Sequence, residues 1–81
     1  MMDHVEIWSY SYERIQEYLL SLGADMDGDI YSLPACTVAL ESLPDRQLGG
    51  LSFARTRVRI EGPGSEEFYH GFRLHFLSGG A

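Results

Sequence analysis

The sequence predicts a small α+β domain in which one helix packs on a single-layer, mainly antiparallel sheet. Three observations support this prediction. One segment has apolar residues at helical spacing, several segments alternate between apolar and polar residues as strands do, and turn-forming glycine, proline and aspartate lie between them. The 81 residues are enough for one domain, 1–81, and contain no internal repeat.

The first two elements are a strand and a helix. Residues 4–8, "HVEIW", alternate between two faces and predict a short strand. Residues 11–23 predict a helix, because apolar side chains recur every three or four positions along this segment. Ser11 is a good N-cap, and Gly23 suits the position after the last turn.

The middle of the chain predicts further strands. Residues 29–33 and 36–42 are expected to be extended, with a break at Pro34, which has no backbone donor for a sheet. Residues 43–50, "LPDRQLGG", have the composition of a loop. Residues 51–60 alternate again, with one apolar face and one face that carries three arginines.

The last segment, 66–77, has two interpretations. Phe68, Phe72 and Phe76 are four residues apart, a spacing that suits one side of a helix and, because four is even, also one face of a strand. We favour the strand, because a helix would place Leu74 on its polar side. The expected order is therefore β-α-β-β-β, and the alternative is β-α-β-β-α with a C-terminal helix.

The chain is acidic and its charge is unevenly distributed. Its net charge is −6, and all six basic residues are arginine. Residues 1–50 contain nine acids and two arginines, whereas residues 51–81 contain three acids and four arginines. An acidic surface disfavours direct nucleic-acid binding and anionic membranes, and favours a partner with a basic surface. No apolar run reaches membrane-spanning length and the N-terminus has no signal-peptide pattern, so we expect a cytoplasmic protein.

The segment "DMDGD", 25–29, begins like a calcium loop but does not continue as one. In the EF-hand loop a glycine stands at the sixth position and a glutamate at the twelfth. Counted from Asp25, the glycine here stands at the fourth position and Cys36 at the twelfth. The pair Asp27-Gly28 instead predicts a tight turn. No set of metal ligands is spaced for zinc either, so no metal or other cofactor is expected.

Arginines at alternate positions form the most distinctive chemical feature of the sequence. Arg55, Arg57 and Arg59 must share one face of their strand. If the last segment is a strand that pairs with them, Arg73 and His75 join the same face. This candidate strip would bind carboxylates, phosphates or an acidic partner. The alternative is a solvated sheet face on which Glu41 or Glu61 neutralises the arginines.

The acidic half of the chain provides a second candidate surface, directed toward a basic partner. Its residues come from the predicted helix and from the turn that follows it, and they are Glu13, Glu17, Asp25, Asp27 and Asp29. Small acidic domains that cover basic surfaces on other proteins include inhibitors and immunity proteins, so charge and size favour a function of that kind.

The sequence contains no phosphate loop, nucleophile elbow or dinucleotide fingerprint, so we do not expect an enzyme. The favoured function is a non-catalytic protein-binding or regulatory module that engages a basic surface. A homodimer joined through an edge strand is a further alternative for so small a core.

A different alternative comes from the end of the chain, "FLSGGA". Its Gly79-Gly80 pair resembles the Gly-Gly end of sulfur-carrier and ubiquitin-like proteins of about this length. The resemblance implies a carrier that is activated at the Gly80 carboxylate after removal of Ala81. It covers these two residues only, and the order strand, helix, strand differs from the two-strand opening of the β-grasp fold.

Overall fold

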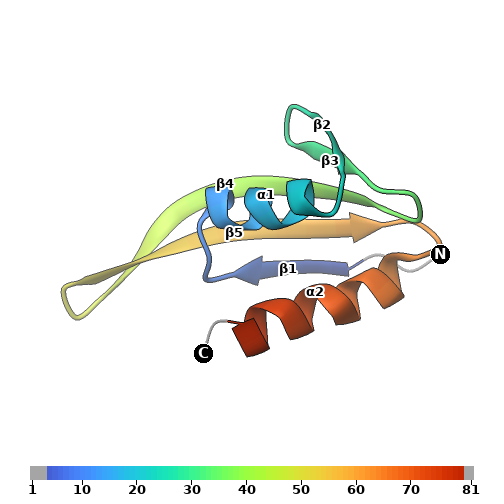
Figure 1. Ribbon diagram of the computed structural model, residues 1–81. Coiled ribbons are helices and arrows are strands. Elements are labelled where there is room, and N and C mark those ends of the chain that lie inside the picture. Colours follow the sequence, from blue (N-terminus) through green and yellow to red (C-terminus); the bar gives the residue numbers. More distant parts are fainter. Residues whose placement is uncertain (1–3, 80–81) are drawn as a thin grey trace.

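A computed structural model describes residues 4–79 and shows one five-stranded antiparallel sheet with two helices (Figure 1). The strands lie in the order β1-β5-β4-β3-β2. The elements are β1 (His4–Trp8), α1 (Tyr12–Ser21), β2 (Asp25–Asp27), β3 (Ile30–Ser32), β4 (Thr37–Leu48), β5 (Leu51–Glu61) and α2 (Ser65–Gly79). This arrangement confirms the predicted small α+β fold with a mainly antiparallel sheet.

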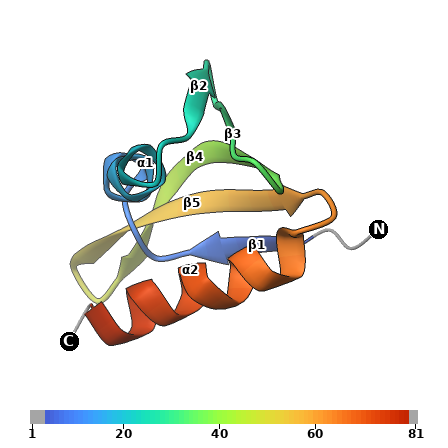
Figure 2. The same cartoon turned by 45° about the vertical axis from the view of Figure 1, so that its right-hand side comes forward.

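Both helices pack on the same face of the sheet. α1 contacts β4, and α2 contacts β1 and β5, as Figures 1 and 2 show. Between helices and sheet lies one apolar core, formed by Ile15, Leu19, Tyr31, Cys36, Val38, Leu40, Val58, Ile60, Tyr69, Phe72 and Phe76. No other element within residues 4–79 covers the opposite face of the sheet, which we call the open face. The side that carries the helices is called the helix side.

The last segment is a helix, so the favoured strand prediction was wrong and the alternative with a C-terminal helix is correct. The spacing of four residues places Phe68, Phe72 and Phe76 along one side of α2, where they contact each other and the core. Leu74 remains on the polar side with 64% of its surface exposed. Burying three aromatic rings outweighs leaving one leucine exposed, because the rings together remove more apolar surface from water than the leucine would.

The predicted loop at 43–50 is also wrong, because β4 continues to Leu48. The pairing with β5 shifts register around Pro44, a position where a strand tolerates a residue without a backbone donor. Only Gly49 and Gly50 form the turn, with φ angles of 54° and 83°. Two consecutive positive φ angles are typical of the two-residue turn that joins twisted antiparallel strands.

The longer strands form a hairpin arm, residues 42–55, that extends past the helices (Figure 1). β1 pairs with β5 only over Thr56–Ile60, and β3 pairs with β4 only over residues 37–39. The arm therefore has no neighbouring strand within the described chain, and its tip exposes Leu48, Leu51 and Phe53.

The predicted turn in "DMDGD" is confirmed. β2 and β3 form a short hairpin around Gly28, which has a φ angle of 64°. The pairing of residues 25–27 into a strand was not predicted, because two aspartates around one methionine lack the β-branched and aromatic residues that favour strands. The predicted break around Pro34 separates β3 from β4.

Hydrogen bonds attach this small hairpin to α1. The Tyr12 hydroxyl donates to Asp29 Oδ1 at 2.6 Å, and Gln16 Nε2 donates to the Tyr31 hydroxyl at 2.9 Å. The Tyr12 and Tyr31 hydroxyls are 3.2 Å apart and also hydrogen-bond to each other. The hairpin is therefore held by α1 as well as by its pairing with β4.

Candidate functional site

The arginine strip lies on the open face of the sheet. Arg55, Arg57 and Arg59 alternate along β5 with Thr56 and Val58, which point into the core and are fully buried. Alternation places the arginines on the side away from the helices. They therefore share one face, as the sequence predicts.

Two of the three arginines of the strip form ion pairs with glutamates. Arg57 forms an ion pair with Glu41, which lies directly opposite on β4. Arg59 Nε is 2.5 Å from a carboxylate oxygen of Glu61 on the same strand. Arg55 Nε donates to the Pro44 carbonyl at 3.1 Å. These contacts correspond to the second interpretation of the strip, in which glutamates on the same sheet face neutralise the arginines.

Arg73 and His75 do not join the strip, which corrects the prediction based on a C-terminal strand. Both belong to α2, on the other side of the sheet. The His75 ring stacks on Tyr18 of α1, with ring centroids 4.0 Å apart. Arg73 and His75 are absent from the strip because the last segment is a helix and does not belong to the sheet.

The predicted acidic surface is divided between two places. Glu13 and Glu17 are exposed on α1. Asp25 and Asp27 flank Met26, which pairs with the buried Tyr31, so their side chains alternate to the open face. Asp29 is occupied by the hydrogen bond from Tyr12.

The two helices give the helix side several exposed carboxylates. The exposed carboxylates of the helices are Glu13, Glu17, Glu66 and Glu67. None of them forms an ion pair with another residue of the described chain, where both ion pairs involve arginines of β5. The helices also carry two cations: Arg14, whose guanidinium lies 5.2 Å from the centre of the Tyr10 ring, and Arg73. Carboxylates thus outnumber arginines on the two helices.

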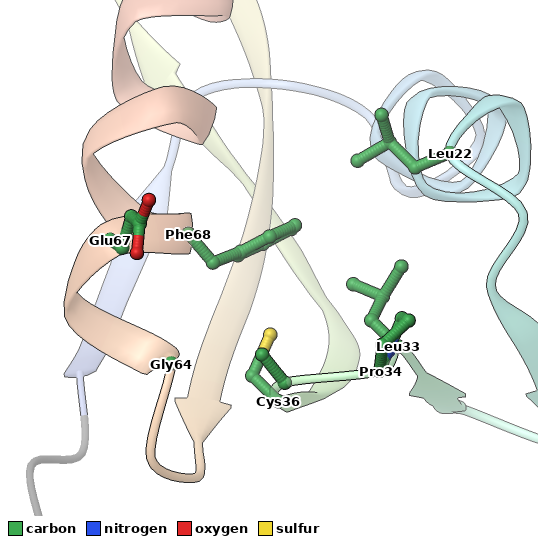
Figure 3. A pocket seen from close by; sticks show the side chains of 8 residues that line it. Leu22, Leu33, Pro34, Cys36, Gly64, Glu67 and Phe68 are labelled. Atoms are coloured by element: carbon green, nitrogen blue, oxygen red, sulfur yellow. The ribbon is translucent and has the colours of Figure 1, made fainter.

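A groove opens between the two helices at one end of this side (Figure 3). The helices contact each other through Tyr18 and Phe72, whose ring centroids are 5.6 Å apart. Leu22 and Phe68 lie toward one end of that contact and stand on opposite sides of the groove. Its volume is about 340 Å³, and its lining consists of Leu22, Leu33, Pro34, Ala35, Cys36, Gly64, Glu67 and Phe68.

The lining of the groove is apolar except for one carboxylate. Cys36 lies between Phe68 and the Leu33–Pro34 segment, as Figure 3 shows. Burial raises the pKa of the Cys36 thiol, so the thiol is protonated near neutral pH and behaves as a small apolar group. Glu67 is the one charged residue that lines the groove. The groove can therefore hold an apolar group, and the charge on its rim favours a cation beside that group.

Sequence reasoning did not find this groove, because it is built from three segments that are far apart in the sequence: Leu22, residues 33–36 and residues 64–68. The signal that could have indicated it is the "GPGS" turn before α2, since glycines on both sides of a proline are typical of a close backbone approach. Gly64 N donates to the Ala35 carbonyl at 2.9 Å, and this bond holds the start of α2 against the β3–β4 connection.

Other groups of potential interest do not form a site. Within residues 4–79 no cluster of three or more histidine, cysteine, aspartate or glutamate side chains could hold a metal ion. His4 stacks on Tyr69 with ring centroids 4.4 Å apart. Gly79 is the last residue of α2, and Gly80 and Ala81, which the carrier alternative requires, lie outside the described residues. No helix of the described chain is both long enough and apolar enough to cross a membrane.

Comparison with models of known protein families and with curated proteins gives no match for this chain.

Proposed function

We propose that this protein is a non-catalytic protein-binding or regulatory module whose helix side engages a basic surface on its partner. The observation that carries the proposal is the distribution of ion pairs. Arg57 and Arg59 on the open face are paired with glutamates, whereas the exposed glutamates of α1 and α2 have no ion-pair partner among residues 4–79.

Unpaired carboxylates on one side are suited to a cationic partner for two reasons. Their negative potential attracts a basic surface over a distance of about 10 Å at moderate salt, which raises the rate of encounter. Lysine or arginine side chains of the partner can then form charge-assisted hydrogen bonds without breaking existing ion pairs of this protein. At Arg57 and Arg59 of the open face, an incoming charge would have to compete with ion pairs that are already formed, whereas Asp25 and Asp27 at the far edge of that face have no ion-pair partner within residues 4–79.

Peptide display tests the proposal. Random peptides are selected on the immobilised protein at about 50 mM salt, and the selected peptides are then measured in solution at about 50 mM and about 500 mM salt. We expect the selected peptides to be enriched in lysine and arginine over the starting library, and their affinity to fall about tenfold or more at high salt. Selected peptides that are neutral or acidic would contradict the proposal.

Two double variants with the same change in charge distinguish the two acidic groups. Glu13→Gln with Glu17→Gln removes two carboxylates from the helix side, and Asp25→Asn with Asp27→Asn removes two from the open face. We expect the first to weaken binding of the selected peptides several-fold more than the second. Equal losses would show that only total charge matters and would contradict the assignment to the helix side.

A further inference from the structure

We infer that the groove between α1 and α2 receives one apolar anchor side chain of the partner, and that a lysine or arginine next to that anchor pairs with Glu67. This inference rests on the proposed function and names the chemistry that the partner presents to the helix side.

The size of the groove suits a single large side chain. A volume of about 340 Å³ lies at the lower end of the range for pockets that hold small ligands, roughly 300–1,000 Å³. Tryptophan and other aromatic side chains commonly fill such pockets near the centre of protein interfaces. The walls suit an apolar group, because the apolar side chains of Leu22, Leu33 and Phe68 line the groove from different segments.

The groove is open to solvent and not a sealed void in the core. Leu22 lines it and is 46% exposed, while Cys36 beneath it is only 5% exposed. An anchor side chain would therefore remove apolar surface of Leu22 from water without displacing core residues. Burial of this apolar surface favours binding, whereas a surface ion pair by itself contributes little free energy.

Charge decides which anchors are favoured. Glu67 lines the groove, its neighbour Glu66 is exposed in the same first turn of α2, and no lysine, arginine or histidine lines the groove. A cation beside the anchor would pair with Glu67, whereas a carboxylate there would be repelled by both glutamates. The favoured partner segment is thus apolar and basic together, which excludes purely polar polycations as well as acidic amphipathic segments.

Two aromatic fragments test the groove independently of any peptide. Tryptamine carries an indole with an ammonium group, and indole-3-propionate carries the same ring with a carboxylate. Each is titrated into the full ¹⁵N-labelled chain and followed by amide chemical shifts. We expect tryptamine to shift the amides around Ala35, Gly64 and Phe68 in the low-millimolar range, as is usual for a fragment of this size. Indole-3-propionate should bind at least about threefold more weakly.

Matched variants separate the groove from the general acidity of the helix side. Glu67→Gln should abolish the preference for tryptamine, and Glu66→Gln, in the same helical turn but outside the groove, should preserve most of it. Leu22→Ala should weaken both fragments, whereas Leu20→Ala should weaken neither. Leu20 has nearly the same exposure as Leu22, 43% against 46%, and does not line the groove.

Each outcome decides between the inference and its rejection. Shifts confined to the groove with the predicted response to Glu67→Gln support it. Absence of shifts at the groove amides at fragment concentrations of about 10 mM, shifts elsewhere, or equal effects of Glu66→Gln and Glu67→Gln would overturn it.

If basic peptides are selected but bind the Leu22→Ala and Glu67→Gln proteins as tightly as the wild type, the groove inference fails while the proposed function stands. If no basic peptide is selected, the proposed function fails, and the fragment titration still decides whether the groove binds an apolar cation.

Discussion

Gly64 lies so close to Ala35 that a Cβ atom at position 64 would come within 2.4 Å of the Ala35 methyl group. Real Cβ atoms essentially never approach another heavy atom so closely, and the obstructing methyl is attached directly to the backbone. Together with the 2.9 Å hydrogen bond from Gly64 N to the Ala35 carbonyl, this contact joins the start of α2 to the β3–β4 connection. It also closes one side of the groove, because both residues line it.

Gly64→Ala should therefore destabilise the protein. The added methyl forces apart two backbone segments, a change that usually costs about 1–3 kcal/mol. Gly71→Ala in α2 is the control, because a Cβ there meets no atom within 4 Å. Alanine is a better helix former, so this change should stabilise the protein by about 0.5–1 kcal/mol. Urea unfolding measures both, and a loss of stability in Gly71→Ala equal to that in Gly64→Ala would contradict the account of this contact.

Phe72→Ala and Leu74→Ala test the helical conformation of the last segment. Phe72 is 1% exposed and Leu74 is 64% exposed, although they are two residues apart and would share a face in a strand. Phe72→Ala should cost about 3–5 kcal/mol, while Leu74→Ala should change the free energy of unfolding by less than about 0.5 kcal/mol. Similar large losses in both variants would indicate a strand.

The tyrosines should make the protein less stable at alkaline pH. Burial raises the pKa of Tyr12 above its ordinary value of 10.0, and hydrogen bonds with Asp29 and Tyr31 raise it further. Burial also raises the pKa of Tyr18, and the hydrogen bond to Glu6 raises that of Tyr69. The unfolded chain then loses protons near pH 10 that the folded chain retains. Stability is consequently unaffected by these groups below about pH 9 and falls as the pH rises through about 10.

Tyr12→Phe provides the check on this alkaline transition. Without its hydroxyl, the variant should lose some stability at neutral pH, because the bonds to Asp29 and Tyr31 are gone. Its stability should then decline less steeply than that of the wild type between about pH 9 and about pH 11. Unfolding curves over this pH range measure the slopes, and equal slopes would mean that Tyr12 does not retain its proton in the folded state.

The hairpin arm should be the least protected part of the long strands. Val58 and Ile60 lie in the sheet under the helices, whereas Ser52 and Phe53 lie where β5 pairs only with β4. An isolated two-stranded hairpin is marginally stable in water, so arm amides should exchange with solvent much faster than those of residues 58–60. Protection of the arm that rises with protein concentration would instead support the homodimer alternative.

The sequence predicts most of the elements because their signals are local. α1 follows from helical spacing between Ser11 and Gly23, and β5 follows from alternation. Ser11 does cap the helix, accepting a hydrogen bond from Arg14 N at 3.3 Å. The segment 66–77 could not be decided locally, since a spacing of four satisfies both periods and the choice depends on what the rings pack against. Contacts with Trp8 and Tyr18, distant in sequence, decide it.

The candidate site was harder to predict than the fold. The arginine strip follows from period two, and the sequence also indicates Glu41 and Glu61 as residues that could neutralise it. Which arginine each glutamate pairs with depends on the strand register, which the sequence does not give. The groove depends on how far apart α1 and α2 lie at one end. No local pattern encodes that separation, because it depends on how two helices that are distant in sequence pack on the same sheet.

The composition of peptides selected on the wild-type protein is the most direct test of the central claim. We predict that they combine lysine or arginine with an adjacent leucine, phenylalanine or tryptophan, because Glu67 and the apolar groove lie side by side. Selection repeated on the Glu67→Gln protein should lose the preference for a basic residue directly beside the apolar anchor, and selection on Glu66→Gln should retain it. Wild-type selections that return peptides without basic residues would contradict the claim that this protein binds a basic partner.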